Sequence, residues 1–161
     1  MRMHTQPWLQ KIPNEIGWYL AGFADGEGSF NVSIKKADEH ILGWKLTLSF
    51  NVSQKDPTVL ALYKRHLGCG TIRYRKDGIG YFEVTGITAL NERVTPFFRK
   101  YHFLSATKKH NFVIFQKILA EVNQPSHLSK EGFTSILQLR EQLNVGRGRK
   151  RKYSVTNVII T

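Results

Sequence analysis

Cysteine, acidic residues and long apolar runs are scarce in this chain of 161 residues. The single cysteine, Cys69, excludes an intrachain disulfide and any zinc site built from several cysteines. No run of about 18 apolar residues occurs, so no membrane-spanning helix is expected. The first 14 residues lack the apolar core of a secretory signal. A Walker loop and a Gly-x-Ser-x-Gly motif are also missing, which argues against nucleotide hydrolysis and a serine-hydrolase triad.

The shortage of acidic residues leaves the chain strongly basic. There are 24 Lys and Arg against 12 Asp and Glu, a net charge of +12. Such an excess favours a polyanionic partner, most often nucleic acid, although a basic protein without such a partner is the alternative. The length suits one compact domain with its own core. We expect a single domain over residues 1–161, with an N-terminal arm at 1–13 and a basic C-terminal tail at 144–161.

Hydrophobic periodicity predicts an α+β fold in which the order α-β-β-α-β-β is followed by three helices. Asn14 is expected to cap a helix over residues 15–25. Pro57 suits the first turn of a helix at 58–67, which the glycines at 68 and 70 end. The other expected elements are strands at 30–35, 45–53, 71–75 and 81–85, and helices at 88–99, 108–123 and 129–143.

Each expected strand has one apolar face, which would pack on helices, and one polar face. The polar face carries four basic residues and one acidic residue, with many short hydrogen-bonding side chains. Arg can read guanine and Asn can read adenine in the major groove, so this face is a candidate DNA-reading surface; an ordinary solvated exterior is the alternative. Its members are Asn31, Ser33, Lys35, Lys45, Thr47, Ser49, Asn51, Arg73, Arg75, Tyr81, Glu83 and Thr85.

The stretch LAGFADGEGSF at residues 20–30 places small and acidic residues where the first helix ends. Trp18, Gly22 and Gly26 lie four residues apart and share one helical stripe, with Ala21 and Asp25 beside it. Small residues on one stripe let a second helix approach closely. A glycine-weakened helix end is the alternative interpretation. The stripe is therefore a candidate helix–helix interface.

Glu27 follows this stripe, at the helix C-terminus, where unpaired carbonyls and the negative end of the helix dipole favour a cation. Mg²⁺ prefers a few oxygen ligands, so Glu27 and the carbonyl of Gly26 form a plausible half-site. If two such helices meet at the glycine stripe, two carboxylates come together. That geometry suits divalent metals that cut phosphodiesters.

LAGFADGEGSF resembles the signature of the LAGLIDADG homing endonucleases. The segments FNVSQKDP, LGCGTIRYR and TKKHNFVIF resemble the same family in matching order, and EGFTSILQLREQLN is typical of relatives from organellar rRNA introns. The resemblance covers residues 16–143. One copy of the signature is present, which in this family implies a homodimer with an α-β-β-α-β-β-α core and a saddle-shaped antiparallel sheet.

The resemblance also implies roles for individual residues. Glu27 matches the acidic metal ligand, Gly26 its neighbouring carbonyl donor, and Asp25 an earlier acid that is more structural than catalytic. Gln54 matches a glutamine that positions water or metal near the scissile phosphate. Lys108 or Lys109 is the candidate for the basic residue that stabilises phosphate charge. An ungapped match to some relatives instead puts Ala106 at the lysine position, and Thr58 where they have an arginine; Lys55 is then the candidate for part of that role.

The implied function is homing: Mg²⁺-dependent cleavage of both strands of a long pseudo-palindromic DNA site, with Mn²⁺ able to substitute and 3′ overhangs left. We expect no membrane partner and no small-molecule substrate. We expect the protein to be encoded and used within an organelle, with the chloroplast favoured over the mitochondrion. An intron-RNA-binding maturase and a catalytically silent DNA-binding regulator are the alternatives. The basic run at 146–152 is expected to be a mobile arm on backbone phosphates, with a nuclear-import signal or a solvated tail as alternatives.

Overall fold

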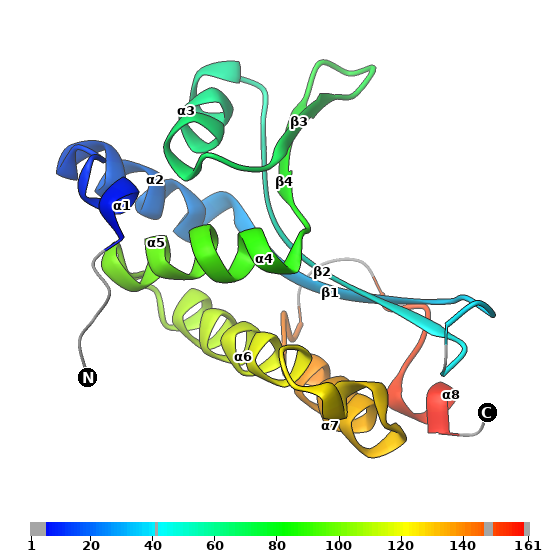
Figure 1. Ribbon diagram of the computed structural model, residues 1–161. Coiled ribbons are helices and arrows are strands. Elements are labelled where there is room, and N and C mark those ends of the chain that lie inside the picture. The colour runs from blue at the N-terminus through cyan, green and yellow to red at the C-terminus, as the bar shows by residue number, and fades with distance from the viewer. Residues whose placement is uncertain (1–5, 41, 147–149, 160–161) are drawn as a thin grey trace. The chain divides into compact units, whose positions relative to one another are not determined.

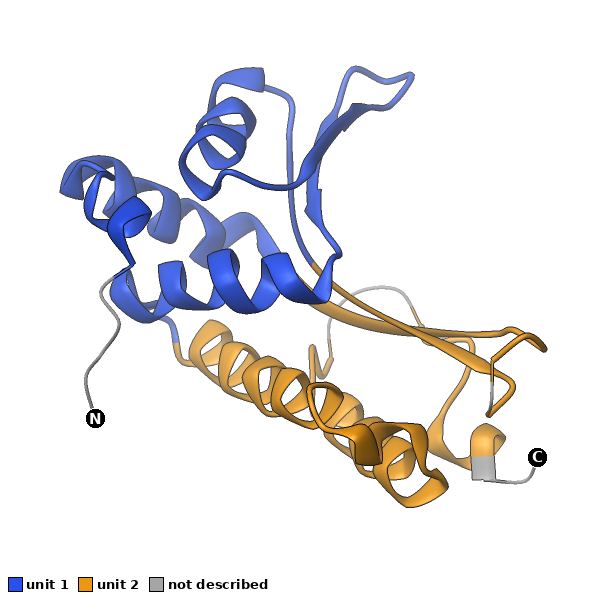
Figure 2. Ribbon diagram, viewed as in Figure 1, with its two compact units in different colours: residues 1–29, 50–105 blue, residues 30–49, 106–161 orange. Residues whose placement is uncertain are grey.

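The computed structural model describes residues 6–40, 42–146 and 150–159. The chain divides into two compact units (Figure 2). The first unit comprises residues 1–29 and 50–105, and the second comprises residues 30–49 and 106–161. In the part of the chain that the structure describes, no helix combines the length and the apolar character needed to cross a bilayer.

The four strands form one sheet in the order β1-β2-β4-β3 (Figure 1). Its strands are β1 (Gly28–Lys36), β2 (Trp44–Gln54), β3 (Thr71–Tyr74) and β4 (Gly80–Val84). In the first unit β2 pairs antiparallel with β4, with Phe50 opposite Val84 and Gln54 opposite Gly80. The predicted strands are thus confirmed, with bounds that move by one or two residues, so that Arg75 and Thr85 lie just beyond β3 and β4.

The helices of the first unit are α1 (Pro7–Gln10), α2 (Asn14–Glu27), α3 (Pro57–Leu67), α4 (Ile87–Ala89), the π-helix η1 (Leu90–Val94) and α5 (Thr95–Lys100). Tyr63 of α3 and Phe82 of β4 stack with ring centroids 5.6 Å apart, and Phe50 of β2 lies 5.1 Å from Phe98 of α5. The Tyr63 hydroxyl donates to the carbonyl of Leu20 in α2, and burial raises the pKa of this phenol. An aromatic core therefore fixes α2 in this unit.

The second unit packs the β1–β2 hairpin with α6 (Ala106–Val122), the 3₁₀ turn η2 (Pro125–Leu128), α7 (Lys130–Glu141) and α8 (Val155–Ile159). Phe30 of β1 lies 5.4 Å from Phe112 and 5.0 Å from Phe115, both on α6. A second cluster joins Ile34, Trp44, Phe133 and Leu137, with Tyr153 and Val158 packed against it. Apolar residues of the hairpin are therefore covered by α6, α7 and the C-terminal segment.

Local sequence signals explain where α3 begins and ends. The Asp56 carboxylate accepts a hydrogen bond from the Thr58 N–H at 2.8 Å, and Pro57 occupies the first turn as predicted. Hydrogen bonds from the backbone and then the side chain of Thr58 lower the pKa of Asp56. Gly68 ends the helix in the left-handed conformation at φ 66°.

Three expectations about helices are corrected. Asn14 is not a cap but the first helical residue, after Pro13, and its side-chain oxygen accepts from the Tyr101 hydroxyl at 3.3 Å. The helix expected at 88–99 is interrupted by the π turn η1, because Pro96 lacks the N–H that an α-helix would donate to Glu92. The short helices α1 and α8 fall in segments predicted to be an arm and a tail.

Candidate active site and nucleic-acid surface

Helix α2 has one face in the core of the first unit and another in solvent. Its buried residues are Gly17, Leu20, Ala21 and Ala24. Ala21 is therefore buried within its own subunit, although the sequence analysis predicted that it lies at an interface with a partner. On the other face, Trp18 and Tyr19 are 46% and 51% exposed, and Gly22, Gly26 and Glu27 are exposed too. A large aromatic surface thus lies beside the predicted glycine stripe.

The glycines of α2 have different roles. A Cβ added to Gly17 would lie 2.2 Å from the ring of Tyr101, so this glycine is required by the fold. A Cβ added to Gly22 or Gly26 would meet nothing within 4 Å. Glycine inside an exposed helix costs about 0.5–1 kcal/mol relative to alanine. Gly22 and Gly26 therefore weaken the helix without a packing benefit inside the chain, which points to an interface.

Asp25 is committed to the segment that precedes α6. Its carboxylate accepts hydrogen bonds from the N–H groups of Leu104 and Ser105, both at 3.0 Å, and from the Ser105 hydroxyl. These bonds satisfy backbone donors immediately before the first residue of α6. The geometry agrees with the structural role that the sequence resemblance implies for this acid.

Glu27 is the last residue of α2, and the chain turns into β1 immediately after it. The Gly28 N–H donates to the carbonyl of Ala24, and a Cβ at residue 28 would lie only 2.8 Å from that oxygen. The Glu27 side chain is exposed at the helix terminus. Here a carboxylate adjoins carbonyls that the helix itself does not pair.

The carboxylate of Glu27 and the neighbouring carbonyl oxygens are suitable ligands for a hard divalent cation, but they are too few to form a complete metal site. Among the described residues, no group of three or more His, Cys, Asp and Glu side chains converges. Mg²⁺ accepts a small number of carboxylates and fills its remaining positions with water and phosphate oxygens. Glu27 and the Gly26 carbonyl therefore fit the half-site expected from the sequence.

Gln54 ends β2 in the first unit, opposite Gly80. Its Oε1 accepts a hydrogen bond from the Lys55 N–H at 2.6 Å, which fixes the side chain close to the backbone. Gln54 is half-buried and Lys55 is exposed. Within the described residues, Gln54 shares no hydrogen bond with Glu27, so its part in the chemistry stays a prediction.

Lys108 and Lys109 belong to the second unit and lie in the first turn of α6. Lys108 is half-buried and Lys109 is exposed. The first turn of a helix presents free N–H groups and a positive dipole end, which both attract phosphate. This location suits a phosphate-binding lysine, and the choice between the two side chains stays open.

The predicted DNA-reading face is only partly accessible. In the second unit Ser33, Lys35 and Lys45 are exposed, whereas Asn31 and Thr47 are half-buried. In the first unit Arg73, Arg75 and Thr85 are exposed, and Tyr81 and Glu83 are half-buried. Ser49 and Asn51 are each only 8% exposed, which leaves little of their surface for contact with a partner. The alternation predicts the faces correctly but not the burial of these two side chains.

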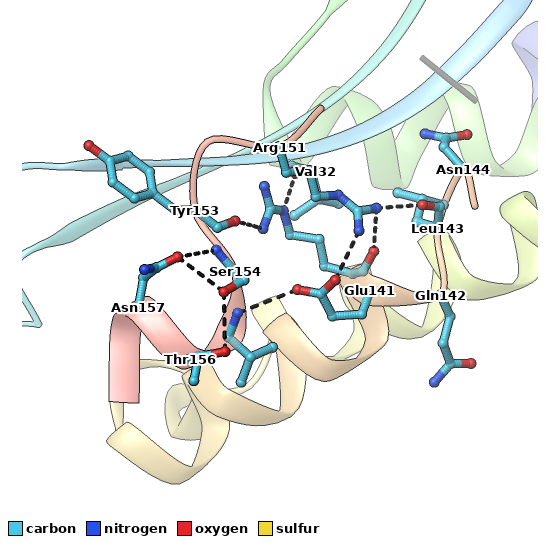
Figure 3. A network of polar contacts seen from close by, with 12 residues as sticks. Val32, Glu141, Gln142, Leu143, Asn144, Arg151, Tyr153, Ser154, Thr156 and Asn157 are labelled. Atoms are coloured by element: carbon cyan, nitrogen blue, oxygen red, sulfur yellow. Dashed lines mark hydrogen bonds and ion pairs between the residues drawn. The ribbon is translucent and has the colours of Figure 1, made fainter. Parts of the chain in front are cut away.

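A network that the sequence does not predict holds the second unit together (Figure 3). Arg140 of α7 is 5% exposed; its Nε donates to the carbonyl of Val32 in β1 at 2.7 Å, and its Nη1 to the carbonyl of Tyr153 at 2.9 Å. Burial, and then the charge of Arg151, lowers the pKa of Arg140. Asn144, at φ 55°, donates to the carbonyl of Phe30 at 2.7 Å. β1 is an edge strand, so these two side chains pair carbonyls that its neighbour strand does not reach.

The C-terminal segment completes this network, so the expected mobile arm is wrong for Arg151. Its guanidinium donates to the carbonyls of Arg140, at 2.7 Å, and Leu143, and it forms an ion pair with Glu141 at 3.2 Å (Figure 3). Carbonyls at the end of α7 therefore engage a cation that was expected to contact phosphates. Residues 147–149 of the same basic run lie outside the described residues.

Comparison with known proteins identifies relatives of this chain. The model of the family described as LAGLIDADG endonuclease matches residues 20–119. Probable intron-encoded endonuclease 2 of Neurospora crassa is 31% identical over 154 residues, which cover 88% of this chain and 32% of that protein. DNA endonuclease I-CeuI of Chlamydomonas moewusii is 28% identical over 149 residues, which cover 88% of this chain and 68% of that protein. The chain spans a third or less of the Neurospora proteins that it matches.

Solved structures give the same fold. The archaeal intron-encoded homing endonuclease I-Vdi141I in complex with DNA has a TM-score of 0.81 and 29% identity, and the match covers 91% of this chain and 93% of that one. The homing endonuclease I-TnaI has a TM-score of 0.77 and 26% identity, with 90% and 95% covered. The predicted α+β class is therefore confirmed.

Proposed function

The chain belongs to the LAGLIDADG endonuclease family, and we propose that it is a homing endonuclease that acts as a homodimer on double-stranded DNA. It cuts both strands of a long pseudo-palindromic site and so promotes intron mobility. The observation that carries this proposal is the exposed stripe of α2, in which Gly22 and Gly26 lack packing partners and lead directly to the exposed Glu27. The intron-encoded names of relatives support the biological role.

In the proposed dimer, the α2 helices of the two subunits cross at Gly22 and Gly26. Trp18, held edge-on against Tyr101 and His102 with centroids 5.3 and 5.2 Å away, borders this contact. The crossing brings one Glu27 from each subunit to a common centre. Each carboxylate, with the neighbouring Gly26 carbonyl, then supplies ligands that one chain alone lacks.

The residues of each subunit divide the chemistry. Glu27 and the Gly26 carbonyl would hold Mg²⁺, or Mn²⁺ in its place, and the bound metal would supply Lewis-acid chemistry at the scissile phosphate. Gln54 orients the attacking water beside the scissile phosphate. Lys108 or Lys109 stabilises the charge that develops on the phosphate in the transition state. Cleavage leaves 3′ overhangs.

DNA binds along the polar face of the sheet. The exposed side chains Ser33, Lys35 and Lys45 of the hairpin and Arg73 of β3 are the leading candidates for contact. The net charge of +12 steers the protein toward the duplex. Organellar use is part of the proposal. The relatives come from Neurospora crassa as well as Chlamydomonas moewusii, so their names favour neither chloroplast nor mitochondrion.

Cleavage selection tests the proposal. The protein is incubated with Mg²⁺ and a randomised DNA library, and the cut molecules are sequenced. We expect a long site with approximate two-fold symmetry. The Glu27→Gln variant should lose cleavage by at least about 10³-fold and keep its affinity for the selected site, because the change removes a metal ligand from an exposed position. Unchanged cleavage by this variant would refute the assignment of Glu27.

A further inference from the structure

Three hydrogen-bonded side chains occupy the polar face of the β3–β4 hairpin: Arg73, Tyr81 and Glu83. Arg73 lies directly opposite Tyr81 in the antiparallel pairing, and Glu83 lies opposite Thr71. Arg73 therefore reaches Glu83 diagonally across the two strands, with its Nη2 3.0 Å from Oε1. The Tyr81 hydroxyl donates to the other carboxylate oxygen, Oε2, at 3.3 Å.

The three side chains differ in how firmly they are held. Glu83 lies on β4, between β2 and β3, and its side chain is 20% exposed, whereas that of Arg73 is 67% exposed. Burial first, and the Glu83 charge second, raise the pKa of Tyr81 to about 12. The Tyr81 hydroxyl therefore stays protonated at neutral pH and donates a hydrogen bond to the Glu83 carboxylate. The carboxylate is anchored from one side and holds the guanidinium on the other.

The carboxylate of Glu83 determines which part of DNA Arg73 can bind well. It offsets much of the guanidinium charge and repels a phosphate, so the pair is a poor ligand for the DNA backbone. The edge of guanine is uncharged and presents two acceptors, N7 and O6, that match the N–H groups of arginine. A guanidinium already held in one orientation also loses less rotamer freedom when it binds.

Building on the DNA-cleaving function proposed above, we propose that Arg73 reads one guanine in the major groove of each half-site and that Glu83 is the residue that positions it. Tyr81 acts one step further back by orienting the Glu83 carboxylate. Arg75 provides a contrast in the same hairpin. It forms an ion pair of 2.9 Å with Asp77, which lies in the exposed turn after β3 rather than on a central strand.

The first test measures base preference. Site selection with the unmodified chain gives the preferred sequence, and binding is then measured to that site and to its single-base variants across one half-site. We expect a guanine that the unmodified chain prefers by about 10- to 100-fold, and Arg73→Ala should remove this preference alone. Lys76→Ala is the matched control: it removes the same charge from the exposed turn of the same hairpin, outside the reading face, and should leave that guanine preferred.

The second test separates positioning from general support of the fold. Glu83→Ala should lower the preference for the same guanine by about 10-fold. It should also strengthen binding to unrelated DNA and steepen the salt dependence by about one counterion, because the released Arg73 becomes free to contact phosphate. Glu83→Gln, which keeps an acceptor for Arg73, should restore part of the preference. A merely structural role would instead weaken binding to all sequences and lower the melting temperature.

The results distinguish this inference from the function on which it rests. If the unmodified chain selects no DNA sequence, both the proposed function and this inference are wrong. If it selects a site, but Arg73→Ala leaves every base preference unchanged, only the reading of guanine is overturned. If Arg73→Ala acts as expected and Glu83→Ala leaves that preference intact, the positioning role of Glu83 is overturned.

Discussion

Replacing Gly22 with alanine should have opposite effects on the single subunit and on the dimer. In the single subunit the added Cβ meets nothing within 4 Å, and residue 22 lies on the exposed face of α2. Alanine is the better helix former, so the free energy of unfolding should rise by about 0.5–1 kcal/mol. For a chain of this size, that corresponds to an increase of about 1–4 °C in melting temperature.

In the proposed dimer the same methyl group occurs twice, once on each helix at the crossing. Overpacking a tight contact costs about 1–3 kcal/mol for each group inserted, or about 2–6 kcal/mol for the pair. Because about 1.4 kcal/mol changes an equilibrium constant tenfold, the dimer dissociation constant should rise by about 30-fold to 10⁴-fold. A larger increase in the dissociation constant would indicate that the two helix backbones approach each other more closely.

Sedimentation equilibrium over a range of protein concentrations measures the dissociation constant directly. The melting temperature is compared at concentrations where both proteins are monomeric, since dimerisation itself stabilises the fold. Gly17→Ala is the matched control. Its Cβ would collide with Tyr101 at 2.2 Å, so it should destabilise the subunit itself. A Gly22→Ala protein that dimerises as tightly as the original would refute the glycine-stripe interface.

Three further predictions concern stability. Arg140→Met should lower the free energy of unfolding by about 2–5 kcal/mol in denaturant titrations, because the carbonyls of Val32 and Tyr153 lose a charged donor; an effect below about 1 kcal/mol would contradict the network. Tyr63→Phe should cost about 0.5–1.5 kcal/mol in the same assay because the Leu20 carbonyl loses a buried hydroxyl donor, and no change would show that this bond contributes nothing. The Asp56 cap should stabilise α3 above about pH 4, and its contribution should disappear as the pH falls through the lowered pKa of the folded state; a stability difference between the original and Asp56→Ala that persists in acid would contradict this.

Features governed by neighbouring residues were predictable from the sequence. The limits of α3 follow from Asp56, Pro57 and Gly68, each of which acts on its own turn. The strands follow from alternation, and the glycines near residue 25 predict the end of α2 to within two residues of its actual end at Glu27. For that reason, the part of the candidate site formed by one helix terminus is already visible in the order of residues.

Features that depend on tertiary contacts were not predictable in the same way. Ser49 and Asn51 alternate correctly but are buried, and no local pattern reports what covers a side chain. The lysine of the site stays unassigned because Lys108 and Lys109 are adjacent on the same helical turn. Arg140 did leave a signal: it continues the stripe of Phe133, Ile136 and Leu137 at helical spacing. A charged residue at an apolar position of such a stripe indicates buried acceptors, and here they are backbone carbonyls.

The division of the chain has a consequence for synthesis on the ribosome. In the second unit the hairpin at residues 30–49 packs with residues from 106 onward, which are made after the 56 residues of 50–105. At about 5–20 residues per second, this delay is about 3–11 s. During that interval Phe30, Ile34 and Trp44 have emerged without α6 or α7, while every segment of the first unit is completed by residue 105. We therefore expect a chaperone to bind the apolar side of the nascent hairpin during this interval.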